Sequence, residues 1–412
     1  MAIKMIRRDI ETDILRWLDD KEIIAIRGPR QCGKTTFLNM IADILKRRKV
    51  KQENIHYISF EDDMEKEKFE KNSKDYISYR LRGKGKHYLL LDEVQYIRNA
   101  GKALKQVFDL VDNIKIIITG SSTLDLNNIG PFLVGRVLLF EMYPFSFKEF
   151  LRAKDEKMHD YYISKRISLT DKSVKEENII LLEDLNTLMQ EYITYGGYPA
   201  VVLEKDMEKK KILLRNLFQT YVEKDVVKTY GSRYRQRITG LIRYLSSLNG
   251  AMINYNEISS VTSLYDKEVK EMLCILEDTY VIRLLKPFHR NLSTELRKNP
   301  KVYFVDTGLR NSIAGRFVFG DAEYGKLLEN YLLNRFRKRK ANYWRTTAKA
   351  EMDLIIDEKI PIESKIYPKI TRSFRSFIKT YKPETAFLVN MDKLYMDEAE
   401  DTKVMVVPFA LM

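Results

Sequence analysis

The sequence has few of the features that place a protein in an oxidising compartment or in a membrane. Its 412 residues include two cysteines, Cys32 and Cys274, which stand far apart and in unlike contexts. A disulfide framework or a zinc site is therefore not expected, and a cytoplasmic location is favoured. No apolar run approaches the roughly 18 residues that a membrane-spanning helix needs. The N-terminus, M-A-I-K-M-I-R-R-D-I, has no apolar core, so we expect no signal peptide.

Acidic residues are also too few to balance the basic ones. There are 72 Lys and Arg residues against 58 Asp and Glu residues, which gives a formal net charge of +14. Such an excess favours polyanionic partners, either nucleic acid or an anionic membrane surface. Because no basic amphipathic helix stands out, we expect nucleic acid, in particular DNA, and no membrane. A protein partner and assembly into a homo-oligomer are open alternatives.

What the sequence does contain, from Glu22 to Pro144, is an alternation of β-rich runs and helical patterns. Strands are expected in E-I-I-A-I-R-G, N-I-H-Y-I-S-F, H-Y-L-L-L-D-E and K-I-I-I-T-G-S-S. This alternation is typical of βαβ units, and the near-continuous apolar runs are typical of buried parallel strands. We therefore predict an α/β fold whose parallel sheet is covered by helices on both faces.

The stretch G-P-R-Q-C-G-K-T follows the first expected strand and opens a helix. It matches the P-loop pattern G-x-x-x-x-G-K-[ST], in which glycines let backbone N–H groups surround phosphates at a helix N-terminus. Lys34 would reach the β- and γ-phosphates, and the Thr35 hydroxyl would bind Mg²⁺. The sequence thus predicts a site for ATP and Mg²⁺ with the nucleotide-binding residues Gly28, Pro29, Arg30, Gln31, Cys32, Gly33, Lys34, Thr35 and Thr36.

Later positions supply the remaining candidates. The run H-Y-L-L-L-D-E ends in Asp92, a second Mg²⁺ ligand at the carboxyl edge of the sheet, and in Glu93, which is placed to polarise the attacking water. In T-G-S-S, Thr119 and Ser121 are candidate polar sensors of the γ-phosphate, although a strand-to-helix cap is the alternative. Arg136 is a candidate arginine finger, in its own subunit or a neighbouring one, or a structural residue.

These motifs and several others resemble the AAA-like P-loop ATPases of archaea and bacteria that carry a nuclease-like C-terminal domain. The further landmarks run in order over nearly the whole chain: L-L-L-D-E-V-Q, I-T-G-S-S, G-R-V-x-x-F-x-x-Y-P-F-S-F-x-E-F, Y-G-G-Y-P, K-V-Y-F-V-D-T-G-L and E-M-D-L-I-I. The resemblance implies a helical lid in which Pro199 approaches the nucleotide base. With it, we expect an ATPase core over 1–150, a lid over 151–232, a winged helix over 233–302 and a restriction-endonuclease-like domain over 303–412.

The winged-helix prediction also follows from the pattern between Arg235 and Asp306. Three helices precede two strands, and the loop between the strands is basic. The third helix, about 266–278, would enter the DNA major groove and the loop would contact phosphates. A helical module that binds only partners is the alternative. A second basic stretch, Arg335 to Lys340, has neighbouring aromatics and is a further candidate nucleic-acid patch.

A last group of candidates lies near the C-terminus, in A-E-M-D-L-I-I-D-E-K-I-P-I-E-S-K. Asp353 and the Glu363-x-Lys365 pair are expected on consecutive strands, with Glu363 and Lys365 on one face. Two carboxylates can bind Mg²⁺ and a lysine can balance phosphate charge, which suits metal-assisted phosphodiester hydrolysis. The arrangement resembles the signature of the restriction-endonuclease-like fold, with Glu329 as the upstream helical acid. The alternative is a structural ion-pair cluster.

Taken together, the sequence favours a P-loop ATPase, an enzyme that hydrolyses ATP and acts on DNA. Two alternatives stay open. One is a nucleotide-dependent regulatory switch that works through a protein partner, and the other is an ATP-regulated, metal-dependent nuclease.

Overall fold

The computed structural model describes residues 5–81, 83–120, 135–174, 180–227, 231–288 and 299–412. The chain forms two compact units: the first contains the chain up to Phe145 together with residues 278–280, and the second contains the rest. The finer division into four domains stays a prediction. None of the helices in the described ranges combines the length and apolar character needed to cross a bilayer.

The first unit is built on a five-stranded, entirely parallel sheet in the order β2-β3-β4-β1-β5. The α/β fold with a parallel sheet is therefore confirmed. The strands are β1 (Ile23–Arg27), β2 (Ile55–Ser59), β3 (His87–Asp92), β4 (Ile114–Gly120) and β5 (Val137–Glu141).

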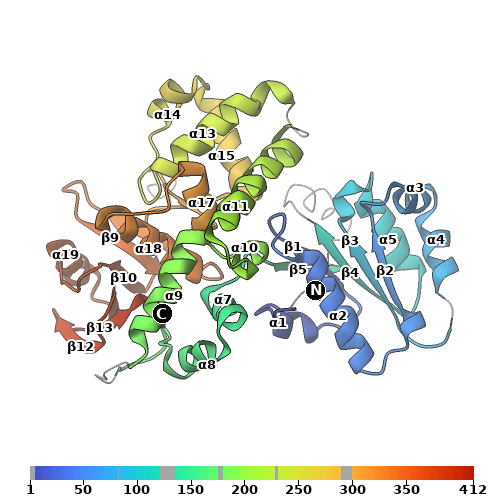
Figure 1. The fold of residues 1–412 in the computed structure, drawn as a ribbon, viewed down its shortest axis with the longest axis horizontal. Helices are drawn as coiled ribbons and strands as arrows, with labels where there is room; N and C mark the ends of the chain where they lie inside the picture. The colour runs from blue at the N-terminus through green and yellow to red at the C-terminus, as the bar shows by residue number, and fades with distance from the viewer. Residues whose placement is uncertain (1–4, 82, 121–134, 175–179, 228–230, 289–298) are drawn as a thin grey trace. The chain divides into compact units, whose positions relative to one another are not determined.

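Helices cover both faces of this sheet because successive strand residues point to opposite sides. In β1, Ile24 and Ile26 pack with α1 and α2, whereas Ile23 and Ala25 pack with α3 to α5. Figure 1 shows α1 and α2 on one side of the strands and α3 to α5 on the other. The helices are α1 (Glu11–Leu15), α2 (Lys34–Arg47), α3 (Asp63–Lys71), α4 (Ser73–Arg80) and α5 (Ala100–Leu110), with short 3₁₀ turns at Gln52–Asn54 and Val94–Tyr96.

The second unit begins with a group of helices. They are α7 (Phe147–Lys154), α8 (Glu156–Lys165), α9 (Leu182–Tyr195), α10 (Pro199–Leu203) and α11 (Met207–Tyr221), followed by a π-helical turn at Val222–Val227 and a 3₁₀ turn at Ser232–Tyr234. Three more helices and an antiparallel strand pair then share one apolar core. These are α13 (Arg235–Ser247), α14 (Tyr255–Thr262), α15 (Asp266–Asp278), β6 (Ile282–Leu285) and β7 (Lys301–Phe304).

The C-terminal part is a six-stranded mixed sheet in the order β12-β13-β11-β10-β9-β8. Helix α19 (Arg372–Tyr381) buries Phe374, Phe377 and Ile378 against one face of it. The strands are β8 (Ala341–Arg345), β9 (Glu351–Ile356), β10 (Ile360–Ser364), β11 (Thr385–Asn390), β12 (Tyr395–Ala399) and β13 (Thr402–Pro408), and a 3₁₀ turn at Phe409–Leu411 follows.

Two of the sequence landmarks, Y-G-G-Y-P and V-D-T-G-L, bind each other. Asp306 caps α17 (Thr307–Ala314) through the Leu309 N–H at 2.8 Å and also accepts the Gly197 N–H at 2.7 Å. The contact is so close that a Cβ on Gly196 would lie 2.1 Å from Asp306 Oδ1, and one on Gly308 would lie 2.0 Å from the Tyr195 carbonyl oxygen. These glycines are therefore required by packing within the second unit.

Helix α18 (Asp321–Arg335) is attached to β7 by side-chain amides. Asn330 Nδ2 donates to the Phe304 carbonyl at 2.7 Å, and Asn330 Oδ1 accepts the Phe304 N–H at 2.9 Å. The amide thus replaces a neighbouring strand, which satisfies buried backbone groups that would otherwise be costly. Since α18 also carries Glu329, this attachment fixes the position of that acid.

Candidate functional site

The glycine-rich loop lies at the carboxyl end of β1, where it turns into α2. Gln31 and Gly33 adopt left-handed backbone conformations, with φ of 59° and 98°. A Cβ on Gly28 would lie 1.8 Å from the Met142 carbonyl oxygen, so this position admits only glycine. The tight turn leaves the first N–H groups of α2 facing the loop, which is the geometry that binds phosphates.

Lys34 is the buried cation of this loop. Its side chain is 4% exposed. Lys34 Nζ donates hydrogen bonds to the carbonyl oxygens of Gly28 and Pro29, at 3.1 and 2.9 Å. The charge is therefore held inside the loop by main-chain acceptors, in a place where phosphate oxygens could take over the same role.

Asp92 is the centre of the polar contacts at this edge of the sheet. The Thr35 hydroxyl donates to Asp92 Oδ2 at 2.7 Å, Tyr57 donates to the same oxygen at 2.9 Å, and Thr119 donates to Oδ1. A hydroxyl and a carboxylate side by side are hard oxygen ligands of the kind that Mg²⁺ prefers, so these residues fit the ion.

Glu93 follows with a left-handed backbone, φ 55°, which is uncommon for a residue with a side chain. Its N–H donates to Thr119 Oγ1 at 3.0 Å, and its carboxylate accepts a hydrogen bond from Gln95 Nε2. Strained conformations of this kind concentrate at functional sites. Thr119 therefore links the two acids, since it contacts both.

Two residues of this site were missed by sequence reasoning. Tyr57 lies on the neighbouring strand β2, and burial followed by the Asp92 charge raises the pKa of its hydroxyl. Arg8 holds the loop from outside: its guanidinium donates to the carbonyl oxygens of Cys32 at 2.8 Å and Tyr143 at 2.6 Å. The hydroxyl of Tyr57 in the middle of β2 could have indicated a polar contact, but no local sequence pattern marks Arg8.

Cys32 belongs to the loop as a packing residue. It is fully buried, and its Sγ lies 3.3 Å from the Met142 carbonyl oxygen. Burial raises the pKa of this thiol, against the opposing effects of Lys34 and Arg8. Cys32 therefore stays a protonated, apolar filler.

The structure does not bring Arg136 to the loop. Its carbonyl oxygen accepts the N–H of Ile23 at the amino end of β1, the end opposite Gly28, and its guanidinium pairs with Asp109 at 3.1 Å. This placement does not support an arginine finger within its own subunit, and action in a neighbouring subunit stays a prediction. Ser121 lies outside the described residues. Pro199 opens α10 in the second unit, and its contact with the base stays a prediction.

Three of the four C-terminal candidates come together. Strands β9 and β10 pair antiparallel, with Ile362 opposite Leu354, and Asp353 and Glu363 are the neighbours of this last pair. Lys365 Nζ lies 2.8 Å from Glu363 Oε1 and 4.0 Å from Asp353 Oδ2. Asp353 Oδ2 also accepts the backbone N–H and hydroxyl of Ser364, both at 2.8 Å.

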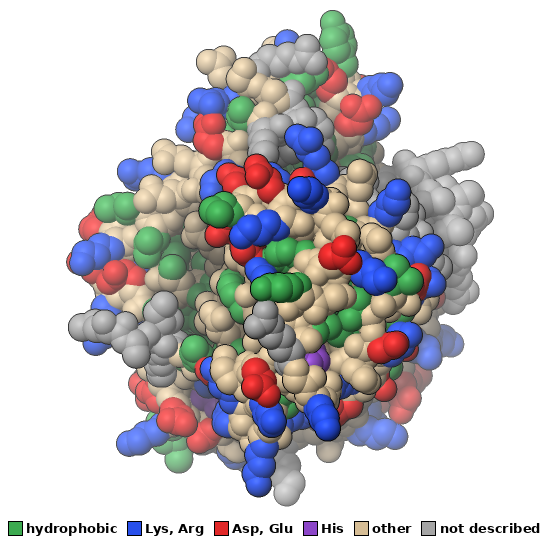
Figure 2. All heavy atoms as spheres, turned by 90° about the vertical axis from the view of Figure 1, so that its right-hand side faces the viewer, with side chains coloured by type: hydrophobic (Ala, Val, Ile, Leu, Met, Phe, Trp, Pro, Cys, Tyr) green, Lys and Arg blue, Asp and Glu red, His purple; other side chains and the backbone are tan. Residues whose placement is uncertain are grey.

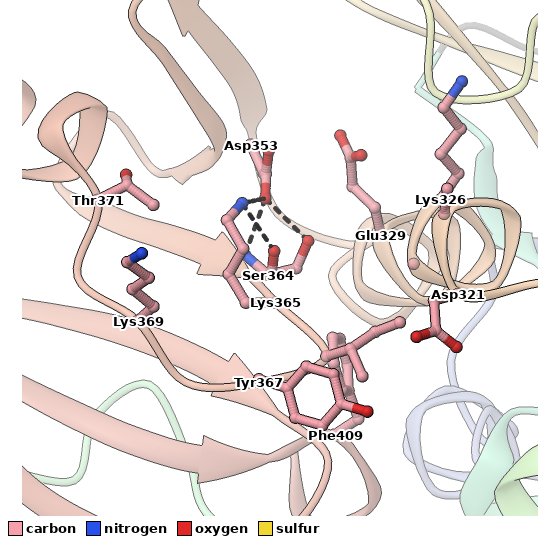
Figure 3. Close-up of a pocket in the computed structure, with 13 residues that line it drawn as sticks. Asp321, Lys326, Glu329, Asp353, Ser364, Lys365, Tyr367, Lys369, Thr371 and Phe409 are labelled. Carbon is pink, nitrogen blue, oxygen red and sulfur yellow. Dashed lines mark hydrogen bonds and ion pairs between the residues drawn. The ribbon is translucent and has the colours of Figure 1, made fainter.

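This cluster borders a cavity of about 640 Å³. Figure 3 shows Lys369 and Thr371 on one side of Asp353 and Lys365, and Glu329 and Lys326 of α18 on the other. Glu363 is 3% exposed, and its Oε2 has no hydrogen-bond partner. Burial, and then the Asp353 charge, raise the pKa of Glu363 to about 8, although Lys365 opposes them.

The fourth candidate, Glu329, is engaged elsewhere. Its carboxylate accepts hydrogen bonds from Lys301 Nζ at 3.0 Å and from the Tyr303 hydroxyl, both on β7. Burial raises the pKa of Glu329, with Lys301 opposing it. Within the described ranges, no group of three or more His, Cys, Asp or Glu residues is arranged to hold a metal ion. The cluster therefore offers Asp353 and Glu363 as a pair, not a three-carboxylate site.

The basic stretch from Arg335 to Lys340 differs from the expected nucleic-acid patch. Arg339 pairs with Asp357 at 2.6 Å, and Lys340 pairs with Glu358. The neighbouring aromatics Tyr343 and Trp344 are buried, at 1% and 5% exposure. They pack in the core instead of presenting faces on which bases could stack. Tyr343 and Trp344 therefore do not belong to an exposed surface, and nucleic-acid binding by the basic residues of this stretch stays a prediction.

Comparison with known families agrees with the geometry of the first unit. Residues 20–151 match an AAA domain, and two further stretches match domains of unknown function, DUF8612 over 186–318 and DUF4143 over 324–412. The chain carries an AAA-type P-loop domain. The match contains the glycine-rich loop, Asp92 and Glu93, so the ATPase-like character of this part is shown by both sequence and structure.

Relatives in sequence occur in bacteria and archaea. An uncharacterised protein of Haemophilus influenzae is 27% identical over 350 residues, which cover 81% of this chain and 78% of that protein. One of Methanocaldococcus jannaschii is 29% identical over 343 residues, covering 82% and 70%. A DNA polymerase III gamma-subunit-related protein of Thermotoga maritima has 13% identity and a TM-score of 0.30, with coverage of 66% and 100%. The low TM-score adds nothing to the AAA assignment, which rests on the family match.

Proposed function

We propose that this protein binds ATP with Mg²⁺ at the glycine-rich loop and hydrolyses it. The observation that carries the proposal is the contact of the Thr35 hydroxyl with Asp92 at 2.7 Å, beside the buried Lys34 and directly before Glu93. These are the groups that P-loop enzymes need at one point: a phosphate-binding cation, two Mg²⁺ ligands and a base.

Each residue has a distinct task in this proposal. With ATP bound, Lys34 would exchange its carbonyl partners for phosphate oxygens, and Thr35 and Asp92 would hold the Mg²⁺ ion. Mg²⁺ bound with ATP neutralises phosphate charge. Glu93 accepts a proton from the attacking water, and Thr119 keeps the Glu93 backbone next to Asp92. Tyr57 holds Asp92 Oδ2, the same oxygen that Thr35 contacts, in place.

Turnover measurements test the assignment. Lys34→Ala and Glu93→Gln should each lower ATP hydrolysis by at least about a hundredfold, because each removes a group that acts on the transferred phosphoryl or the water. Glu93→Gln should still bind ATP. Lys105→Ala, which removes an exposed lysine of α5, is the matched control and should turn over ATP normally. Unchanged hydrolysis in Lys34→Ala would remove the proposal.

We infer further that the protein acts on DNA. The net charge of +14 supports this. The basic side chains do not form one continuous patch on the face in Figure 2, where, outside the grey atoms, basic and acidic side chains are interspersed. A basic surface does occur on α19, where Arg372, Arg375, Lys379 and the following Lys382 are exposed. No side-chain hydrogen bond or ion pair joins these four to another described residue, so their charges remain available to phosphates.

DNA binding through this helix is testable by charge removal. Arg372→Gln with Arg375→Gln should weaken binding to duplex DNA and reduce its salt dependence by about two phosphate contacts. ATP turnover should rise with DNA if the motor acts on it. Turnover that ignores duplex, single-stranded and branched DNA, with no binding, would favour the alternative of a nucleotide-dependent switch acting on a protein partner.

The folds expected for the second unit belong to the same proposal. Helices α13 to α15 and the β6–β7 pair are consistent with a winged helix, and the six-stranded sheet with α19 is consistent with a restriction-endonuclease-like domain. The third helix is a weak candidate for the major groove, because its exposed Lys267 already lies 4.0 Å from Glu271. The residues of the loop that would form the wing, 289–298, lie outside the described ranges.

A second function, metal-dependent cleavage of phosphodiesters, is favoured by one specific observation. Glu363 Oε2 is buried without a partner next to Asp353, which is costly unless something binds it. A divalent ion between the two carboxylates would satisfy it. Incubation of DNA with Mg²⁺ or Mn²⁺ should then give cleavage that Asp353→Ala abolishes and that Glu398→Ala, an exposed acid on β12, leaves intact. No cleavage in the wild-type protein would leave the cluster as a structural ion pair.

A further inference from the structure

A second cavity of the second unit has a different character from the acidic one. It has a volume of about 500 Å³ and lies among α13, α17 and the first turns of α18. This volume is within the range of small-molecule sites. Four cationic side chains line it against a single carboxylate, Glu323; they are Arg243, Arg310, Arg316 and Lys326.

Arg310 is the fixed element of this cavity. Arg310 is buried, with 5% of the residue exposed. Nε donates to the Ser246 carbonyl oxygen at 2.8 Å, and Nη1 donates to Glu323 Oε1 at 2.8 Å. The third nitrogen, Nη2, makes no hydrogen bond within the described part of the chain. The guanidinium is thus held in one orientation, with Nη1 also donating to Asn311 Oδ1 at 3.2 Å, and Nη2 is left as a donor on the wall of the cavity.

Part of the positive charge has a structural explanation. Helix α13 ends at Ser247 and α17 at Ala314, and cations near helix C-termini compensate the free carbonyl groups there. Arg310 does this for α13 through Ser246. Arg316 is accounted for by its ion pair with Glu323, at 3.6 Å.

Arg243 and Lys326 have no such explanation. Neither side chain has a hydrogen bond or ion pair with another described residue, although both line the cavity. Lys326 lies between the two cavities and lines both, and Figure 3 shows its side chain extending from α18 away from Asp353 and Lys365. Two unpaired cations beside the unused Arg310 donor leave this cavity with an excess of positive charge that an anion would neutralise.

We propose that this cavity is a binding site for a phosphate group, separate from the glycine-rich loop. Arg310 offers the planar, pre-oriented donor set that suits a phosphate, and Arg243 and Lys326 supply the second and third charges. The phosphate belongs either to a small phosphorylated ligand or to the backbone of a nucleic acid strand. The proposal does not depend on ATP hydrolysis.

The test uses the full chain with Lys34→Ala, so that phosphate binding at the glycine-rich loop is suppressed. In this background, Arg243→Gln with Lys326→Gln removes the two unpaired cations, both of which are exposed enough for the fold to tolerate the change. Lys209→Gln with Arg215→Gln, on α11 outside the cavity, removes the same charge and is the matched control. Equal melting temperatures of the two variants establish that both are folded.

Pyrophosphate is titrated by calorimetry, and a single-stranded oligonucleotide by fluorescence anisotropy. A small-ligand site predicts saturable pyrophosphate binding that weakens at least about tenfold in the cavity variant and not in the control. A site for nucleic-acid backbone predicts a loss of the same size for the oligonucleotide alone. If the two variants bind both probes with equal affinity, or neither probe binds at all, the proposal is wrong.

Discussion

Replacing Gly28 by alanine tests whether the glycine-rich loop and β5 are packed as tightly as the structure indicates. An alanine Cβ at this position would lie 1.8 Å from the Met142 carbonyl oxygen and 2.9 Å from its carbon, whereas real Cβ contacts are essentially never shorter than 3.0 Å. The loop and Met142 must therefore separate by at least 1.2 Å, the difference between 3.0 and 1.8 Å.

The neighbouring atoms have little freedom to give way. The Met142 N–H donates to the Arg27 carbonyl oxygen at 2.8 Å, and Met142 is 2% exposed. Forcing extra volume into such packing costs about 1–3 kcal/mol, and weakening the main-chain bond costs about 1 kcal/mol more. A displacement of about 1 Å at a catalytic loop can also lower the rate by about a hundredfold.

We therefore expect Gly28→Ala to lower kcat/KM for ATP about a hundredfold and the melting temperature of the first unit by roughly 5–15 °C. Turnover assays and calorimetry measure the two effects. Gly240→Ala is the matched control: no atom lies within 4 Å of its Cβ, and it is inside α13. It should retain full turnover and gain about 0.5–1 kcal/mol of stability. Wild-type turnover in Gly28→Ala, with a melting temperature within about 2 °C of the wild type, would refute the reasoning.

Two further predictions concern the second unit. Gly308→Ala should destabilise it by about 2–4 kcal/mol, because its Cβ would lie 2.0 Å from the Tyr195 carbonyl oxygen, whereas Gly240→Ala should not; denaturant titration measures both, and equal midpoints would contradict the packing described. For Glu363, the pKa near 8 means that the native state keeps a proton that the unfolded chain loses near pH 4.5, so stability falls as pH rises between these values. Without divalent metal, Glu363→Gln should therefore remove a loss on the order of 3 kcal/mol between pH 5 and 8, and parallel pH profiles for the two proteins would be the contrary result.

Most of the first unit could be predicted from sequence, although β5 was not among the expected strands. Its strands are continuous apolar runs, and its function-bearing residues are consecutive or follow directly after strands. In parallel α/β sheets the carboxyl ends of the strands meet at one edge, so Thr35 and Asp92 are adjacent although 57 positions separate them. Arg136 was another exception. Its position in the sequence did not reveal that Arg136 lies directly before the amino end of β5, where its guanidinium pairs with Asp109.

The second unit was less accessible to sequence reasoning because its contacts are long-range. The aromatics near the basic stretch looked like a binding surface, but Trp344 packs against Phe377 in the core of the C-terminal sheet. Glu329 had the spacing of a helical acid for a metal site, but Lys301 and Tyr303 of β7 already bind it. Sequence spacing does not show which distant side chains will contact a buried carboxylate.

The sequence by itself thus determined the parallel sheet, the phosphate-binding loop and the acids at the carboxyl end of β3, since each depends on residues close together in the chain or on a fixed rule of sheet topology. Tertiary structure alone decided that Gly196 and Gly308 bind one another's segments, that Arg8 supports the loop, and that Arg243 and Lys326 stay unpaired beside Arg310. These outcomes depend on which distant side chains and carbonyl groups meet, and burial makes each such meeting, or its absence, energetically decisive.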